Sequence, residues 1–257
     1  MSPSTTNIYP GLITDADNTL WDTNCVYADA QRWLLEQSEI KAGAICKDPD
    51  RLGFLRRVDQ AIAKRHHSGL RYPSHLLLSA LVDVLLGRSV EESAGRSLMR
   101  IDTSANDITE EFDELLRKAP PLRDGVRAGL DMLLRANVPI VVATEGAADL
   151  CKNRLEHWEL SRKVQSVVSA AKTPELFLRL SQLLKLTPER CLAVGDQLDR
   201  DVAPARAAGL KTAHFPGGFL PSWQSGIDVE PDFTVNSYEQ VANLAIDGST
   251  QASNMAT

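Results

Sequence analysis

Hydrophobic and polar residues follow two different rhythms along this chain of 257 residues. Short apolar runs that end in polar loops occur near the start and again beyond residue 137. Such runs are too short for buried helices and are rich in β-branched residues, so they predict strands. The predicted strands cover residues 12–14, 138–143, 164–168, 191–194, 211–215 and 233–235.

Segments with helical spacing separate these strands in the second half of the chain. The predicted helices there cover residues 126–136, 150–160, 174–186 and 202–208. Strands that alternate with helices are typical of a parallel sheet covered on both faces. The pattern therefore predicts an α/β fold with a Rossmann-like core.

The stretch from Trp21 to about Leu116 interrupts this alternation. Its apolar residues recur at helical spacing, for example over residues 75–86, which end at Gly87, and strand patterns are absent. We therefore predict an all-helical domain inserted after the first strand. The expected boundaries are residues 8–22 and 120–246 for the α/β core, 23–119 for the insertion and 247–257 for a disordered tail of small and polar residues.

The composition narrows the function classes. Hydrophobic residues make up 43% of the chain, enough for a large core, and the net charge of −6 argues against a nucleic-acid partner. No segment approaches the roughly 20 apolar residues of a membrane helix, so no membrane partner is expected. The N-terminus lacks a signal-peptide pattern, and the four cysteines are far apart. Reduced thiols and a cytoplasmic protein are expected.

Polar residues with matched chemistry follow several of the predicted strands. Any one of them alone is more often a helix cap, a turn residue or a solvated charge, but here they recur at successive strand ends, where open α/β sheets bind ligands. Grouped carboxylates repel each other unless a cation joins them, and a few hard oxygen ligands suit Mg²⁺. An ammonium and a hydroxyl would hold phosphate oxygens. The residues are Asp15, Asp17, Thr144, Lys172, Asp196, Asp199 and Asp201.

These positions resemble the four motifs of the haloacid dehalogenase (HAD) superfamily. Asp15-Ala16-Asp17-Asn18-Thr19-Leu20 is similar to the first motif, D-x-D-x-T-L, and Thr144 after a hydrophobic strand is similar to the second. The segment 172–177 resembles the third motif. The segment 195–201, followed by Ala-Arg-Ala-Ala-Gly at 205–209, resembles the fourth. All four occur in the family's order, and the helical insertion occupies the place of its type 1 cap.

The resemblance implies a role for each matched residue. Asp15 would be the nucleophile that becomes an aspartyl phosphate. Asp17 would act as general acid for the leaving alcohol and then as general base for water. Thr144 and Lys172 would bind the substrate phosphate.

The resemblance also implies a Mg²⁺ cofactor. The carboxylates of Asp15 and Asp196 and the backbone carbonyl of Asp17 would be its ligands. Asp201 would support the metal waters or Lys172, and Asp199 is a second candidate for that support. The predicted function is Mg²⁺-dependent hydrolysis of a small phosphorylated metabolite, a phosphate monoester, through an aspartyl phosphate.

Other functions remain open at this point. A phosphomutase shares the motifs, and a 2-haloacid dehalogenase would attack carbon with Asp15, although it would not need Asp17. A receiver-type signalling domain would not have Lys172 before Asp196, and a degenerate HAD scaffold could serve as a binding module. One residue departs from the family pattern: Glu145 follows Thr144, where Asn or Gly is common. Its carboxylate would repel phosphate unless it is turned away or paired.

Overall fold

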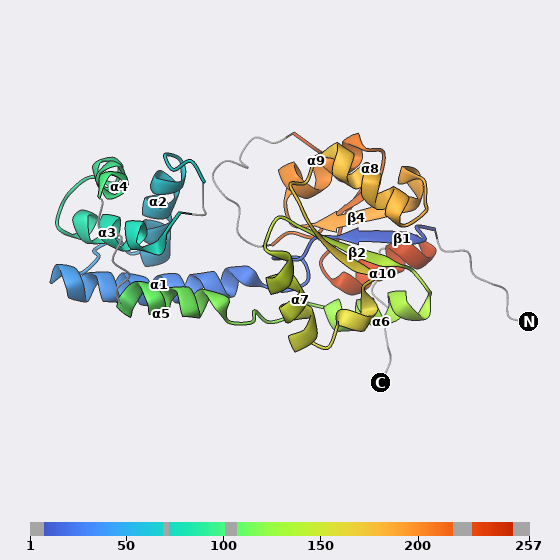
Figure 1. Ribbon diagram of the computed structural model, residues 1–257, viewed down its shortest axis with the longest axis horizontal. Coiled ribbons are helices and arrows are strands. Elements are labelled where there is room, and N and C mark those ends of the chain that lie inside the picture. Colours follow the sequence, from blue (N-terminus) through green and yellow to red (C-terminus); the bar gives the residue numbers. More distant parts are fainter. Residues whose placement is uncertain (1–7, 69–71, 101–106, 218–227, 249–257) are drawn as a thin grey trace, which may run out of the picture. The chain divides into compact units, whose positions relative to one another are not determined.

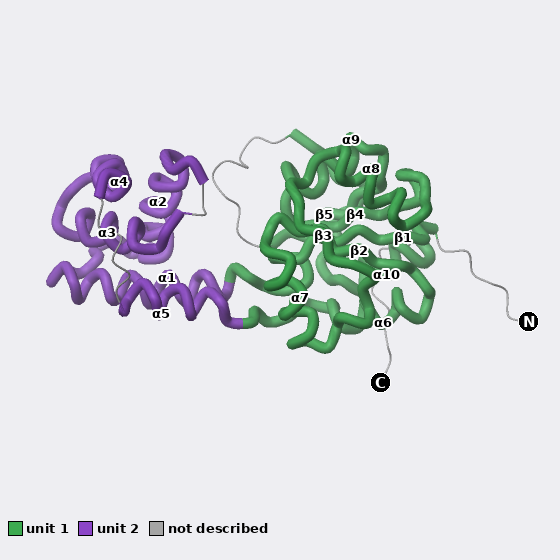
Figure 2. Tube along the Cα trace, in the orientation of Figure 1, with its two compact units in different colours: residues 1–24, 119–257 green, residues 25–118 purple. Residues whose placement is uncertain are grey.

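The computed structural model describes residues 8–68, 72–100, 107–217 and 228–248. The chain forms two compact units, one made of residues 1–24 and 119–257 and the other of residues 25–118 (Figure 2). The predicted tail lies outside the described residues from position 249 onward. Two residues assigned to it are ordered, because α10 ends at Asp247 and Gly248 caps it in a left-handed conformation.

The first unit is built on a parallel sheet of six described strands in the order β3-β2-β1-β4-β5-β6. The central strand β1 pairs with β2 on one side and β4 on the other, with Leu12 beside both Ile140 and Leu192. The chain thus runs outward from β1 through β2 to β3 and then returns to the other side of β1, where β4, β5 and β6 follow. The strands are β1 (Gly11–Thr14), β2 (Ile140–Thr144), β3 (Ser166–Ser169), β4 (Cys191–Gly195), β5 (Lys211–His214) and β6 (Phe233–Thr234).

Helices cover both faces of this sheet (Figure 1). Successive residues of β1 point to opposite faces, so Leu12 belongs to one apolar cluster and Ile13 to the other. The cluster around Leu12 contains side chains of α6 (Val126–Arg135), α7 (Ala148–His157) and α10 (Tyr238–Asp247). The cluster around Ile13 contains side chains of α8 (Pro174–Leu183) and α9 (Ala203–Ala207). The predicted α/β class with helices on both faces is confirmed.

Four elements of this unit were not predicted. The terminal helix α10 packs against α6, and Gly129 permits their close approach, because a Cβ there would lie 2.6 Å from the Tyr238 carbonyl oxygen. A π-helical turn, η3 (Leu198–Val202), also joins β4 to α9. Two short 3₁₀ turns, η1 (Ser161–Lys163) and η2 (Pro188–Arg190), precede β3 and β4.

The chain leaves and re-enters the first unit through two adjacent segments. Trp21 pairs with Leu122 in an antiparallel bridge. The Asp22 N–H donates to the Pro121 carbonyl at 2.8 Å, and the Arg123 N–H donates to the Leu20 carbonyl at 3.0 Å. The outgoing and returning segments are therefore fastened to each other within the core.

Helices are the only regular elements among the described residues of the second unit. Side chains cap the first turns of two of its helices. The Asp50 carboxylate accepts from the Gly53 N–H, and the Ser89 hydroxyl accepts from the Glu92 N–H. Fully buried residues such as Leu34, Leu55 and Leu81 form its own apolar core. Its helices are α1 (Thr23–Ala42), which starts in the first unit, α2 (Arg51–Ala63), α3 (Ser74–Leu85), α4 (Val90–Met99) and α5 (Asp107–Arg117).

None of the helices in the described ranges combines the length and the apolar character needed to cross a membrane. All four cysteines lie in the described ranges, and no disulfide joins them there.

Candidate active site

Four ionisable side chains meet at the carboxyl ends of the central strands. Asp15 directly follows β1, and its backbone N–H donates to the Val194 carbonyl of β4 at 2.8 Å. Asp196 directly follows β4, and Asp201 lies one turn further on, in η3. All three carboxyl groups are buried, with exposures of 4 to 7%. This is the edge where parallel strands of an open sheet place a ligand.

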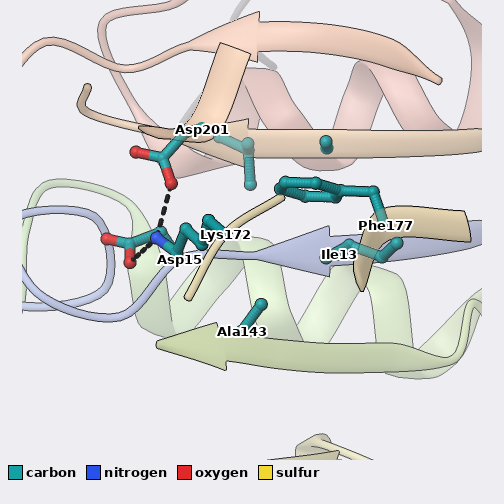
Figure 3. Close-up of a pocket in the computed structure, with 8 residues that line it drawn as sticks. Ile13, Asp15, Ala143, Lys172, Phe177 and Asp201 are labelled. Atoms are coloured by element: carbon teal, nitrogen blue, oxygen red, sulfur yellow. Dashed lines mark hydrogen bonds and ion pairs between the residues drawn. The ribbon is translucent and has the colours of Figure 1, made fainter. Parts of the chain in front are cut away.

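Lys172 links two of these carboxylates. Its ammonium donates to Asp15 Oδ1 and to Asp201 Oδ1, as the dashed lines in Figure 3 mark. The Lys172 side chain is only 5% exposed. Apolar side chains of Ile13 and Phe177 line the pocket behind the lysine. The ammonium is thus held at a fixed place beside the Asp15 carboxylate.

Negative charge exceeds positive charge in this cluster, and the pKa values show the consequence. Burial raises the pKa of Asp15 to about 7, against the opposing effect of Lys172. Burial, followed by the charges of Asp15 and Asp201, raises the pKa of Asp196 to about 9. Burial alone would lower the pKa of Lys172, but Asp15 and Asp201 raise it above its usual range.

The donor set fits a divalent cation. One carboxylate oxygen from each of Asp15, Asp196 and Asp201 lies within 4.8 Å of the others. Asp15 Oδ2 is buried and accepts no hydrogen bond from the described residues. A buried carboxylate oxygen without a partner is costly, and a hard cation such as Mg²⁺ would satisfy it. Asp15 and Asp196 would hold the ion, with Asp201 close to both.

The second strand supplies Thr144, which is 2% exposed. Its Oγ1 accepts a hydrogen bond from the Gly146 N–H at 3.0 Å. Glu145, the residue that departs from the family pattern, turns its carboxylate to two donors. Arg200 Nη1 lies 2.9 Å from Oε2, and the Lys172 backbone nitrogen lies 3.2 Å from Oε1. The carboxylate is therefore paired.

Asp17 is held by three donors that meet at one oxygen. Its Oδ1 accepts from Arg154 Nη1 at 2.6 Å, and from Trp21 Nε1 and Thr23 Oγ1 at 2.8 Å each. A Cβ on Gly146 would lie 3.4 Å from Asp17 Oδ2 and 3.2 Å from Thr144 Oγ1. The second oxygen of Asp17 therefore lies on the side of the loop that carries the Thr144 hydroxyl.

A glycine and an arginine shape these loops. Gly195 lets the Asp201 side chain approach β4, since a Cβ at this position would lie 2.1 Å from Asp201 Cγ. Arg123 joins two loops by donating to the backbone carbonyls of Asn18, Phe215 and Pro216. Burial lowers the pKa of Arg123, which also stacks 3.4 Å from the centre of the Phe215 ring.

The structure thus brings Asp15, Lys172, Asp196 and Asp201 together. Asp199 lies outside this cluster: its side chain is 28% exposed, and its carboxylate is 3.9 Å from Arg200 Nε. Two contacts were not predicted from the sequence, the Arg154–Asp17 pair and the Arg200–Glu145 pair. A signal for the first existed, because Arg154 shares the buried face of α7 with Cys151 and Leu155, a stripe expected to be apolar.

A family model for haloacid dehalogenase-like hydrolases matches residues 9–209, so the chain belongs to this family. No curated protein sequence matches the chain.

Solved structures with the same fold cover nearly the whole chain. YfnB of Bacillus subtilis, assigned as a HAD-hydrolase and bound to magnesium, is 17% identical with a TM-score of 0.63 and covers 92% of this chain and 98% of its own. A haloacid dehalogenase-like family hydrolase of Xanthomonas campestris is 19% identical with a TM-score of 0.62, and the match covers 95% of this chain and 99% of that structure. L-2-haloacid dehalogenase of Xanthobacter autotrophicus is 16% identical with a TM-score of 0.58, and the match covers 93% of this chain and 99% of that structure. At these identities the likeness shows the shared fold.

Proposed function

We propose that this HAD-like hydrolase cleaves small phosphate monoesters through an aspartyl phosphate on Asp15, with Mg²⁺ as its cofactor. The observation that carries the proposal is the arrangement at Asp15. One of its oxygens accepts from Lys172 and the other is buried without a partner among the described residues, while the carboxylate as a whole lies close to Asp196. A carboxylate held in this way beside a fixed ammonium suits nucleophilic attack on a phosphoryl group.

The first step forms a bond between an Asp15 oxygen and phosphorus and breaks the bond from phosphorus to the ester oxygen. The leaving alcohol takes a proton from Asp17. Lys172 and Thr144 bind the phosphoryl oxygens of the substrate. Mg²⁺, when bound at Asp15 and Asp196, would neutralise phosphate charge.

In the second step Asp17 removes a proton from water, and the water oxygen attacks phosphorus. The bond between phosphorus and Asp15 breaks, which releases inorganic phosphate and restores the carboxylate. The magnesium bound to YfnB supports the choice of cofactor, and the acidic cluster of this chain supports it independently.

The dehalogenase neighbour makes carbon–halogen cleavage the second candidate. That reaction needs no acid to protonate a leaving alcohol, whereas Asp17 lies in this chain on the side of Thr144. The carboxylate at position 17 therefore favours phosphate esters.

Hydrolysis of p-nitrophenyl phosphate by the purified chain tests the proposal, with Mg²⁺ and with EDTA. Asp15→Asn should lower the rate by several powers of ten. Asp149→Asn, at a 93% exposed carboxylate on α7, is the matched control and should retain the activity. Activity that survives in EDTA or in Asp15→Asn would contradict the proposal, and release of halide from 2-chloropropionate would favour the dehalogenase.

A further inference from the structure

The carboxylate of Asp17 is bound asymmetrically. Its Oδ1 accepts three hydrogen bonds, from Arg154, Trp21 and Thr23, whereas Oδ2 accepts none from the described residues. Three donors around one oxygen fix both the place of that oxygen and the rotation of the carboxylate plane. The direction in which Oδ2 points is therefore determined by the donors to Oδ1.

Arg154 is the charged member of this donor set and an unusual residue in its surroundings. Its side chain is 7% exposed, although it lies on α7 between apolar neighbours. Its Nε–H is buried and donates to no described residue. Only the arginine of this pair is buried, because the Asp17 side chain is 40% exposed. Burial of the guanidinium and of its unsatisfied Nε–H opposes the gain from the ion pair and from the Trp21 ring 5.7 Å away, so fold stability alone gives little reason for an arginine at this position.

The orientation of Asp17 supplies a reason. The chain segment that carries the Thr144 hydroxyl continues through Gly146 into α7, and α7 carries Arg154. The same segment therefore carries a phosphate-binding hydroxyl and the guanidinium that orients Asp17. The guanidinium contacts Oδ1, whereas Oδ2 and the Thr144 hydroxyl both lie close to Gly146.

We propose that Arg154 is a positioning residue that directs Asp17 Oδ2 at the oxygen of the leaving group. The inference rests on the proposed function, in which Asp17 gives a proton to that oxygen and later takes one from water. Arg154 contacts no reacting atom in this scheme. Its effect passes entirely through the carboxylate of Asp17, so phosphate binding by Thr144 and Lys172 is independent of it.

A leaving-group comparison separates this role from a structural one. Phenyl phosphate and p-nitrophenyl phosphate have similar shapes, but the phenoxide leaving group depends far more on protonation. Arg154→Met removes the guanidinium and keeps an unbranched chain that fills buried space. We expect kcat on phenyl phosphate to fall about 10-fold or more, part of the full effect of a general acid. The loss on p-nitrophenyl phosphate should be smaller, and KM should stay unchanged for both.

Three further variants complete the experiment. Arg154→Lys should restore part of the kcat on phenyl phosphate. Arg127→Met is the matched control, because Arg127 is an exposed arginine that donates to the Trp158 carbonyl at the end of α7 and does not reach Asp17. Should Arg154→Met fail to fold, Thr23→Val removes another donor to the same oxygen with little change in volume and is compared on the same two substrates.

Measuring Arg154→Met in the Asp17→Asn variant distinguishes a failure of the Arg154 proposal from a failure of the proposed function. Arg154→Met should cause no further loss in this background, because the residue through which it acts has already been disabled. An equal loss of kcat on both substrates, or a full additional loss in Asp17→Asn, would overturn the role of Arg154 and leave the phosphatase proposal intact. Normal activity of Asp17→Asn itself would overturn the proposed function.

Discussion

Arg200 and Glu145 form an ion pair between two loops of the candidate site, with 2.9 Å between Arg200 Nη1 and Glu145 Oε2. The second oxygen of the same carboxylate accepts from the backbone N–H of Lys172. Glu145 therefore links the loops that follow β2, β3 and β4. The charge beside Thr144 is balanced by a residue of η3, which removes the conflict with an anionic substrate.

Loss of Arg200 should make the substrate bind more weakly. Arg200→Gln leaves the Glu145 charge without this partner, and we expect KM for p-nitrophenyl phosphate to rise a few-fold. A partly exposed pair is worth about 1 kcal/mol or less. Glu145→Gln in the same chain should restore KM, because it removes the repulsive charge and keeps the acceptor for Lys172. Arg206→Gln, at an arginine that donates to the Glu230 carbonyl, is the control. Failure of the double variant to recover would contradict this role.

Metal binding and pH should be coupled in the stability of the protein. The folded-state pKa is about 7 for Asp15 and about 9 for Asp196, both above the value of 3.8 expected in an unfolded chain. At pH values between the unfolded pKa and the folded pKa of each group, the folded chain binds more protons than the unfolded chain. The free energy of unfolding therefore falls as the pH rises through this range. The melting temperature in EDTA should therefore decrease from pH 5 to pH 9.

Mg²⁺ should reverse this loss, because it competes with protons for the same oxygens. The rise in melting temperature on adding Mg²⁺ should be larger at pH 8 than at pH 6. Asp196→Asn removes a ligand and should reduce the response at both values. A response to Mg²⁺ that does not vary with pH would show that the ion binds elsewhere.

Two glycines offer a matched pair of substitutions. Gly195→Ala places a methyl group in the space of the Asp201 carboxylate and should displace the partner of Lys172. We expect lower activity and weaker stabilisation by Mg²⁺. Gly95 lies within α4, and an added Cβ there would meet no atom within 4 Å. Gly95→Ala should therefore stabilise the chain by about 0.5–1 kcal/mol without affecting the site. Thermal denaturation and Mg²⁺ titration of both variants check the contrast, and an unaffected Gly195→Ala site would contradict it.

The strands and the class of fold could be predicted because their signals are local. Apolar runs separated by helical spacing indicate a parallel sheet, and its geometry then brings the residues after each strand to one edge. Asp15 and Asp196 follow neighbouring strands and therefore meet there, although they are far apart in the sequence.

The contacts of Asp17 could not be predicted in this way. Arg154 reaches it across 137 positions from a helix face, where a helical pattern gives the face but no partner. The motif resemblance gave Asp201 as the first candidate to support Lys172 and Asp199 as the second, but the turn that separates the two residues could not be predicted. The π-helical turn buries Asp201 and leaves Asp199 partly exposed, and nothing in the spacing of the two residues indicates such a turn.

The bridge between Trp21 and Leu122 joins the two chain segments that flank residues 25–118, so the sheet can form whatever the length of the segment inserted between them. Closing a long loop costs entropy that grows only slowly with its length, and here hydrogen bonds of the core itself fasten the two ends. A short turn in place of residues 25–118 would close the same hairpin. Such an arrangement permits grafting: one insertion can be exchanged for another of different length or fold while the nucleophile and its lysine keep their places.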